Sequence, residues 1–292
     1  MKNETILLIG AAGNNGQATL NALLSSPGDH IRIRAAVRSE ARAQALRAKY
    51  PTIETVVVDL DQAASLAPAF IGVDRVFMIP GNVENRAQHA KYAVDAAKAA
   101  GTVKQFVLYS VVGAEWEAIL FARQFREAEK YLEASGLPWT HLRTIWFQEN
   151  FLNWAAGIKQ GAFYFGVREG RFAPLNVQDI GAIAARVLTT EGHERKAYNI
   201  TGPELLSGHD MAAIFTRVTG RQVDYVSPQA TSTYESLIQD GWPEWQAKGV
   251  LELFEVFASD QAAVISPDGE NLLGRPLTRF EDFVQQHKST FI

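Results

Sequence analysis

The segment Gly10-Ala11-Ala12-Gly13-Asn14-Asn15-Gly16 decides the fold of this chain. It follows an apolar, β-branched run and opens a stretch rich in Ala and Leu, so it predicts a tight turn between a strand and a helix. Gly10 permits the turn, Gly13 lets the backbone approach a pyrophosphate, and Gly16 lets the helix pack on the strand. Backbone N–H groups at the start of the helix would then face the phosphates. In this context the glycines predict a dinucleotide-binding site.

Short β-branched runs alternate with Ala-rich stretches of helical period through the first half of the chain. The runs predicted to be strands are 5–9, 31–37, 53–58, 75–79, 105–109 and 139–142. The stretches predicted to be helices are 15–24, 40–49, 62–70, 85–100 and 119–134. Such a series of strand and helix units is typical of an α/β, Rossmann-type doubly wound parallel sheet.

The strict alternation ends after Arg143, where Pro, Gly and aromatic residues become denser up to Pro174. Further helices are predicted at 177–189, 209–219, 234–240 and 245–258, with short strands at 198–200 and 222–225. We therefore expect a dinucleotide-binding domain over residues 1–150, with its sheet completed by segments near 172–202. A smaller, mixed α/β cap region is expected over residues 151–292.

Composition excludes several classes of function. The formal net charge of −4 offers no basic field for nucleic acid or anionic lipid, so neither is expected as a partner. The chain contains no Cys, and its His residues are scattered without metal-ligand spacing, so no metal is expected. No apolar run approaches the roughly 18 residues that span a bilayer, and no leader is recognisable. The expectation is a cytoplasmic protein, either a monomer or a homodimer.

The charge at the end of the second predicted strand indicates which dinucleotide is bound. NAD-selective proteins usually place a carboxylate there to bind the ribose 2′-hydroxyl. This chain has Arg38 instead, and Arg42 follows one helical turn later. Guanidinium groups pair well with a phosphate and stack on flat rings, so NADP(H) is the predicted cofactor. A solvated arginine pair at a helix start is the alternative.

Two short segments at other strand ends are added to the predicted cofactor site. Asp59-Leu60 follows the third strand and Ile79-Pro80-Gly81 follows the fourth. Ligands of such sheets bind at the carboxyl ends of the strands. Ordinary turn chemistry explains the same residues equally well.

Several segments together resemble the NmrA-like group of atypical short-chain dehydrogenase/reductases. They are the glycine motif, Arg38 and residues 142–151, 177–181 and 198–204. The resemblance covers nearly the whole chain and implies an NADP(H)-binding fold. Members of the group include quinone and azo-dye reductases, triphenylmethane reductases, ergot-alkaloid iminium reductases and catalytically silent NADP(H) sensors. The resemblance therefore implies the fold but not the activity.

The resemblance also shows what is missing. Many members of the wider superfamily carry Tyr-x-x-x-Lys on the helix after the fifth strand, where Tyr gives a proton and Lys lowers its pKa. The matching positions here are Phe121 and Phe125. Ser110, at the end of the fifth strand, matches the superfamily's strand-end Ser or Thr and is the weak candidate for a catalytic residue at the nicotinamide end. A simple capping role is the alternative.

Eight of the 27 residues from 139 to 165 are aromatic, whereas aromatic residues make up 10% of the whole chain. The segment begins at the sixth strand, whose carboxyl end should face the nicotinamide. The residues expected to line a flat, apolar substrate pocket are Phe121, Phe125, Trp146, Phe151, Trp154 and Tyr164. Ordinary core packing is the alternative. Glu149-Asn150 resembles the family's Glu-Asn pair that shapes the cofactor end, and Phe147 and Asn150 are assigned to the cofactor site.

Two hypotheses of function follow. The first is an NADPH-dependent reductase that transfers a hydride to a planar, electron-poor acceptor such as an iminium, a quinone or a dye. Such acceptors need an oriented nicotinamide but no protein acid, and an aromatic wall would hold a cationic one by cation–π contact. The second is a regulatory protein that senses NADP(H) and acts through a protein partner without turnover.

Overall fold

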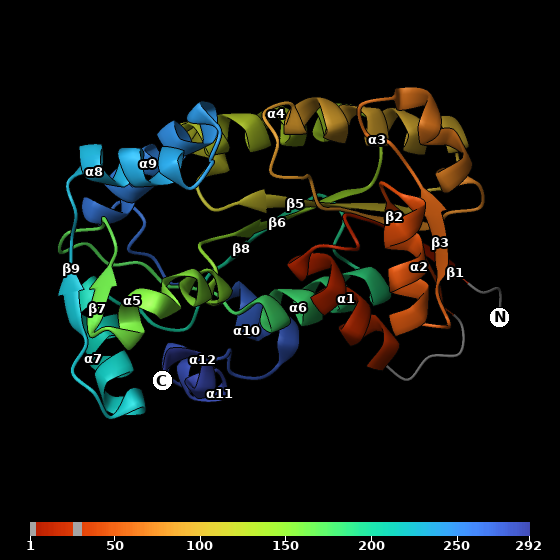
Figure 1. Ribbon diagram of the computed structural model, residues 1–292. Coiled ribbons are helices and arrows are strands. Elements are labelled where there is room, and N and C mark those ends of the chain that lie inside the picture. The colour runs from red at the N-terminus through yellow and green to blue at the C-terminus, as the bar shows by residue number, and fades with distance from the viewer. Residues whose placement is uncertain (1–3, 26–30) are drawn as a thin grey trace.

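Seven parallel strands form the central sheet, in the order β3-β2-β1-β4-β5-β6-β8 (Figure 1). The computed structural model describes residues 4–25 and 31–292. The strands are β1 (Glu4–Ile9), β2 (Ile31–Val37), β3 (Glu54–Val57), β4 (Arg75–Met78), β5 (Gln105–Val111), β6 (Trp139–Thr144) and β8 (Lys196–Ile200). The order reverses between β1 and β4, which places a crevice at the carboxyl ends of these strands. The predicted doubly wound sheet is confirmed.

Helices cover both faces of the sheet (Figure 1). One face carries α1 (Asn14–Ser25), α2 (Glu40–Lys49) and α6 (Val177–Thr189), and the other carries α3 (Arg86–Ala100) and α4 (Leu120–Ala134). Helices α1 and α6 cross closely because α6 has a glycine at the crossing. A β-carbon on Gly181 would lie 2.6 Å from the carbonyl carbon of Ala18. Separate apolar cores fill the two helix–sheet interfaces.

One predicted helix in this half has a different form. Residues 62–70 contain two 3-10 helices, η1 (Ala63–Ser65) and η2 (Ala67–Phe70), in place of one α-helix. Pro68 lies at the start of η2 and has no N–H to continue a helical hydrogen-bond ladder. Leu66 and Phe70 are nevertheless fully buried, so the apolar spacing of the segment reflected packing rather than helix type.

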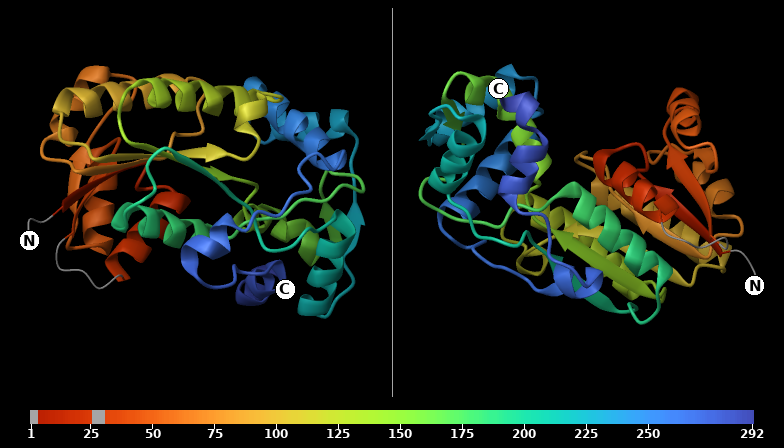
Figure 2. Two further views of the ribbon diagram at one scale, coloured as in Figure 1. Left: turned by 180° about the vertical axis from the view of Figure 1, so that it is seen from behind. Right: turned by 90° about the horizontal axis from the view of Figure 1, so that it is seen from below.

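The remaining elements lie beyond the carboxyl end of the sheet or along its edge (Figure 2). They are η3 (Ala114–Trp116), η4 (Gln148–Trp154), α5 (Ala155–Lys159), β7 (Ala162–Tyr164), α7 (Gly208–Thr219), β9 (Asp224–Val226), α8 (Ala230–Gln239), α9 (Glu244–Ala258), α10 (Asp268–Leu273), α11 (Phe280–Gln286) and α12 (Lys288–Phe291). Strands β7 and β9 form a small parallel sheet. Helix α9 lies next to the end of α4, α8 packs on α9, and α10 packs on α6 and β8.

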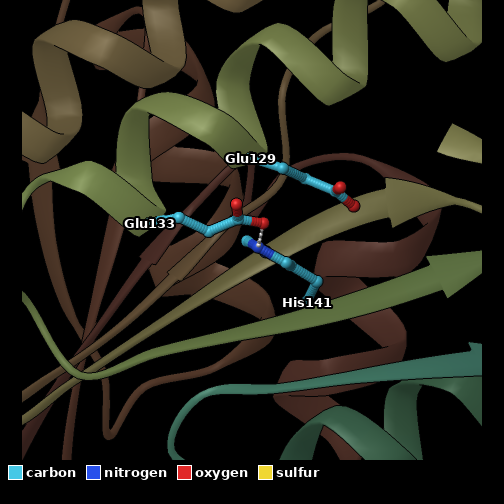
Figure 3. A group of neighbouring side chains, drawn as sticks. All are labelled: Glu129, Glu133 and His141. Carbon is cyan, nitrogen blue, oxygen red and sulfur yellow. Dashed lines mark hydrogen bonds and ion pairs between the residues drawn. The ribbon is translucent and has the colours of Figure 1, made fainter. Parts of the chain in front are cut away.

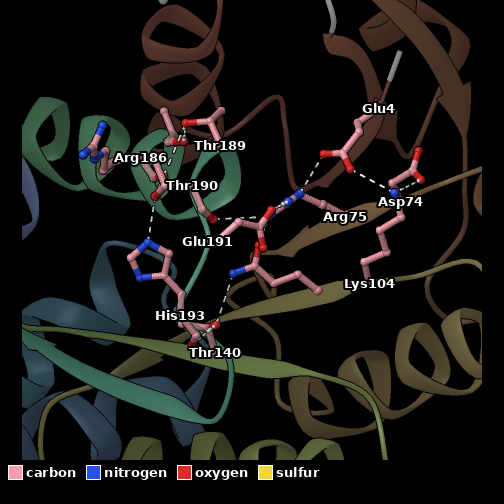
Figure 4. A network of polar contacts seen from close by, with 12 residues as sticks. Glu4, Asp74, Arg75, Lys104, Thr140, Arg186, Thr189, Thr190, Glu191 and His193 are labelled. Atoms are coloured by element: carbon pink, nitrogen blue, oxygen red, sulfur yellow. Dashed lines mark hydrogen bonds and ion pairs between the residues drawn. The ribbon is translucent and has the colours of Figure 1, made fainter. Parts of the chain in front are cut away.

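A network of ion pairs and hydrogen bonds lies at the amino end of the sheet (Figure 4). The side chain of Arg75 on β4 is 6% exposed and pairs with Glu4 and Glu191. Its Nη1 also donates to Gln105 Oε1 at 2.9 Å. Lys104 Nζ lies 2.9 Å from Glu4 Oε1. Arg75 and Lys104 thus both have carboxylate partners at this end of the sheet.

In the described part of the chain, no helix has the length and apolar content needed to cross a membrane.

Candidate functional site

The glycine turn joins β1 to α1 with very little space to spare. Gly10 has a φ of +88°, and a β-carbon there would lie 2.7 Å from the carbonyl oxygen of Ile79. A β-carbon on Gly16 would lie 2.3 Å from the carbonyl oxygen of Gly10. At Gly13 the nearest atom, the carbonyl oxygen of Gly10, would be 3.6 Å away, an ordinary van der Waals contact, and Gly13 lines a cavity described below. Gly10 and Gly16 are therefore required by packing, whereas Gly13 leaves room for a ligand over the start of α1.

Two adjoining cavities occupy the crevice. The smaller, of about 240 Å³, is lined by Gly10, Gly13, Asn14, Asn15, Gly16, Ile79, Phe147, Glu149, Asn150 and Val177. The larger, of about 1180 Å³, lies between the carboxyl ends of the strands and helices α4, α8 and α9. The residues that line both cavities are Asn15, Ile79, Phe147 and Asn150. A ligand held at the glycine turn can thus extend directly into the larger cavity.

Some of the turn and strand-end residues predicted for the cofactor site line a cavity, and others do not. Pro80 and Gly81 line the larger cavity. Asp59 and Leu60 line neither cavity, and the Asp59 carboxylate accepts from Asp61 N and Gln62 Nε2 within a turn. That contact favours the turn-chemistry alternative for these two residues. The remaining two, Ala11 and Ala12, belong to the turn but line neither cavity.

Arg38 and Arg42 lie beside the carboxyl end of β2. Ser39 caps α2 between them and accepts from the backbone N–H of Arg42. Both arginines are exposed, and neither forms an ion pair with any residue that the structure describes. Two unpaired guanidinium groups are available there for an anionic ligand.

The walls of the larger cavity are mainly aromatic and aliphatic. Of the residues predicted for the substrate pocket, those that line it are Phe121, Phe125, Trp146, Trp154 and Tyr164. Phe151 does not line it, and that prediction is wrong. The Phe151 ring is 0% exposed and packs against Phe163 and Phe280 in the core of the cap. The aromatic enrichment of the segment therefore serves the pocket and the core together.

Ser110 also lies away from the crevice. Side chains alternate along a strand, so Tyr109 and Val111 point into the larger cavity while Ser110 points to the opposite face. Ser110 is 0% exposed, and its hydroxyl lies near Glu129. The Ser110 assignment to the cofactor and catalytic site is therefore corrected. Tyr109 was missed, although the two-residue period at the end of the strand was the signal that could have found it.

Tyr109 and Tyr164 both line the larger cavity, and Tyr109 is the less exposed of these two phenols. Its ring centroid lies 5.9 Å from that of Phe125 and 6.4 Å from that of Phe147. Its hydroxyl shares a 2.7 Å hydrogen bond with Thr144 Oγ1. Burial raises the pKa of Tyr109 to about 12, so the phenol keeps its proton at neutral pH. It can therefore donate a hydrogen bond to a bound molecule.

Glu149 lines the smaller cavity next to the glycine turn. Its carboxylate accepts from the backbone N–H of Val177, with both oxygens at 3.0 Å. Burial outweighs that hydrogen bond and raises the pKa of Glu149 to about 7. The charge of this carboxyl therefore changes near neutral pH beside the predicted position of the phosphates.

A separate acidic cluster lies between α4 and β6 (Figure 3). Glu129, Glu133 and His141 bring ligand atoms within 4.8 Å of one another, a geometry that could hold a metal ion. Two cations already occupy that role, because Arg143 Nε lies 2.9 Å from Glu129 and Arg126 pairs with both glutamates. Burial is the largest single influence on the pKa of Glu129 and acts to raise it, but the hydrogen bond from Arg143 and the contributions of His141 and Ser110 together lower the pKa. The cluster is an ion-pair network that ties α4 to the sheet.

Comparison with known proteins gives a consistent picture. A family described as NmrA-like matches residues 2–271. The NAD(P)H azoreductase of Xenophilus azovorans is 32% identical over 98% of this chain and 99% of its own. The NADPH complex of a quinone oxidoreductase from Escherichia coli superposes with a TM-score of 0.88 at 30% identity, over 97% of this chain and 99% of its own. The NADP(H) complex of a Citrobacter sp. triphenylmethane reductase superposes with a TM-score of 0.87 at 26% identity, over 97% and 99%.

Substitutions in the glycine turn should separate binding from folding. Gly13→Val should lower the affinity for NADPH by at least about a hundredfold, because its branched carbons fill the cavity over the turn and displace charge-assisted contacts. Its melting temperature without cofactor should stay near that of the unaltered protein. Gly16→Ala should instead destabilise the protein by about 1–3 kcal/mol, since its β-carbon overlaps the backbone of Gly10. Calorimetric titration and thermal unfolding measure the two effects, and tight binding by Gly13→Val would contradict the assignment.

Glu149 should make cofactor binding depend on pH. The phosphates add negative charge beside Glu149, so binding favours its protonated form. Affinity should be fully present below about pH 7 and fall by up to about tenfold per pH unit above it. The affinity should be measured between about pH 7 and 9. This range lies above the second pKa of the 2′-phosphate, about 6, so the charge of the cofactor does not change during the measurement.

The control variants for this effect are Glu149→Gln and Glu255→Gln. Glu149→Gln should remove the decline in affinity, whereas Glu255→Gln should keep it, because Glu255 pairs with Arg168 on the exposed surface. An equal pH profile for the unaltered protein and Glu149→Gln would show that Glu149 does not sense the cofactor.

Proposed function

The chain belongs to the NmrA-like family, and we propose that it is an NADPH-dependent reductase that transfers a hydride to a quinone or dye-like acceptor. The observation that carries this proposal is the wall shared by the two cavities. Asn15, Ile79 and Phe147 face both the glycine turn and the aromatic chamber, so a dinucleotide on the turn would present its far end to an acceptor. Relatives named as azoreductase and quinone oxidoreductase match almost the whole chain.

The residues present fit NADPH. The N-terminus of α1 and the cavity at Gly13 would receive the pyrophosphate. The unpaired guanidinium groups of Arg38 and Arg42 would receive the 2′-phosphate. Phe147 and Asn150 would lie along the part of the cofactor that enters the larger cavity.

The larger cavity fits a flat organic acceptor. Its volume of about 1180 Å³ lies just above the usual range of small-molecule sites, about 300–1,000 Å³, and leaves room for a nicotinamide and a multi-ring compound together. Its aromatic walls offer faces on which such rings can stack. A sensor without turnover would not require a chamber of this size, so the cavity favours the reductase hypothesis.

When bound, the reduced cofactor supplies a hydride. The chain itself holds the acceptor, excludes water with its apolar walls and places hydrogen-bond donors at the acceptor's oxygen. The neutral phenol of Tyr109 can donate to an oxygen that gains negative charge as the hydride arrives. The hydroquinone anion formed from a quinone then takes its proton from water as it leaves the site, because Tyr109, with a pKa of about 12, holds its own proton more tightly than a hydroquinone of pKa about 10 does.

Cofactor selectivity tests the role of the arginine pair. The unaltered protein should bind NADPH more tightly than NADH, and Arg38→Ala should remove most of that difference. A charge-assisted contact contributes about 1.5–3 kcal/mol, which corresponds to roughly one to two decades in affinity. The control is Arg32→Ala. Arg32 is exposed and lies near the amino end of β2, so this variant should keep the preference for NADPH. Equal dissociation constants for both cofactors in the unaltered protein would refute the assignment.

Turnover tests the reductase itself and the two hydroxyl groups of β5. NADPH oxidation should accelerate with quinones and azo dyes and remain slow with simple ketones, which need a stronger acid. Tyr109→Phe should lower kcat/KM for a quinone by about tenfold or more while leaving NADPH affinity within about twofold. Ser110→Ala should change neither value by more than about twofold, because Ser110 faces the opposite side of the sheet.

Two results would count against these assignments. A larger effect of Ser110→Ala than of Tyr109→Phe would return the donor role to Ser110. If NADPH binds tightly and no acceptor oxidises it, the reductase hypothesis fails and the sensor hypothesis replaces it.

A further inference from the structure

Arg86 is a buried cation without a carboxylate partner. It begins α3, is 6% exposed and lines the larger cavity. Its Nε donates to the carbonyl of Val83 at 3.2 Å and its Nη2 to Asn82 Oδ1 at 2.7 Å. No acidic side chain within residues 4–25 or 31–292 forms an ion pair with it. Its other N–H groups are free to bind a molecule in the cavity.

Aromatic rings surround this guanidinium. Its carbon Cζ lies 5.2 Å from the ring centroid of Phe121, 5.0 Å from that of Phe125 and 5.8 Å from that of Trp245. The rings of Phe121 and Phe125 therefore already make cation–π contacts with a residue of the protein. This changes the expectation that these rings hold a cationic acceptor, because such an acceptor would meet a fixed positive charge.

Three further residues of the cavity lining carry polar groups that are not exposed to solvent. Tyr109 carries a neutral phenol, and Trp146 has a buried Nε1–H with no hydrogen-bond partner among the described residues. Asn15 Oδ1 is a buried acceptor at the wall shared with the smaller cavity. Asp240 is the acidic residue of the lining and is exposed to solvent. Arg86 is thus the buried charged group of the chamber, and the described lining places no buried carboxylate beside it.

We propose that Arg86 is the anchor for an anionic or electron-rich oxygen of the acceptor, so that the cavity selects oxyanion-bearing acceptors over cationic ones. This inference deepens the proposed function and rests on it. A charge removed from water is costly unless it is paired, and a sulfonate, carboxylate or quinone oxygen would supply the missing partner. Iminium compounds and triarylmethane cations should consequently be disfavoured.

A purely structural role for Arg86 is the competing explanation. The guanidinium could serve only to hold α3, α4 and α9 together through the three rings. Both roles predict burial and stacking, but only the anchor role predicts that the charge of a ligand decides its affinity.

The first test uses the unaltered protein saturated with NADP⁺. The probes are three anthraquinones that differ at the 2-position, which carries a sulfonate, a methyl group or a trimethylammoniomethyl group. Binding is followed by quenching of tryptophan fluorescence and by calorimetry, so it does not depend on turnover. The sulfonate should bind at least about tenfold more tightly than the cationic probe, in the order sulfonate, methyl, ammonium. Equal affinities, or the reverse order, would overturn the proposal.

The second test uses Arg86→Met, which keeps a long apolar side chain among the rings, and Arg86→Lys, which keeps the charge. Arg86→Met should lose about tenfold to a hundredfold in affinity for the sulfonate and about twofold or less for the methyl probe. Arg86→Lys should keep the sulfonate preferred over the ammonium. The control is Arg217→Met. The guanidinium of Arg217 is exposed and pairs with Glu281 away from the cavity, so its loss should change the affinity for none of the probes.

The outcomes separate this inference from the proposed function. A folded Arg86→Met variant that binds all three probes like the unaltered protein would leave Arg86 only a structural role. If Arg86→Met does not fold, the probe order in the unaltered protein and in Arg86→Lys still decides the matter. If the sulfonate binds through Arg86 but no quinone oxidises NADPH, the reductase proposal fails while the charge selection stands.

Discussion

The close approach of α1 to the carbonyl oxygen of Gly10 is the constraint on which the site depends. Only glycine at position 16 allows it, and it places the start of α1 directly over the carboxyl end of β1. The same helix is fixed from the other side, because Gly181 lets α6 pack against Ala18. Asn15 is thereby held at the junction of the two cavities. The geometry of the crevice thus follows from two backbone contacts that any β-carbon would break.

Features that depend on neighbouring residues could be predicted from the sequence, and features that depend on distant ones could not. The glycine turn and the alternation of strands and helices are local patterns, so the doubly wound sheet followed from them. Phe151 could not be separated from the pocket aromatics, because burial in the cap core depends on Phe163 and Phe280 from other elements. The stacking of Arg86 was equally hidden, since its rings come from α4 and α9.

Charge pairing distinguishes the two ends of the sheet. At the amino end, Glu4 pairs with both Arg75 and Lys104. Beside β6, Arg143 pairs with Glu129. At the carboxyl end, Arg86 remains charged in an apolar wall without such a partner. A buried and unpaired charge is unfavourable for stability. The incomplete pairing at the carboxyl end is therefore consistent with the proposed role of Arg86 as an anchor for a ligand.

Phe121 and Phe125 match the usual Tyr and Lys positions, but a phenol and a cation are still present in the crevice and come from other elements. Phe121 and Phe125 stack on Arg86, so the cation comes from α3, while the phenol comes from Tyr109 on β5. Arg86 acts to lower the pKa of Tyr109, but burial is the larger effect and the pKa remains about 12. Such a phenol is a weak proton donor and a good hydrogen-bond donor. It suits a hydroquinone anion, whose conjugate acid ionises at about 10 as phenols do, because such an anion is stable and needs a hydrogen bond rather than a proton from the protein. The cation from α3 and the phenol from β5 are therefore consistent with the proposed preference for acceptors whose reduced oxygen is a stable anion.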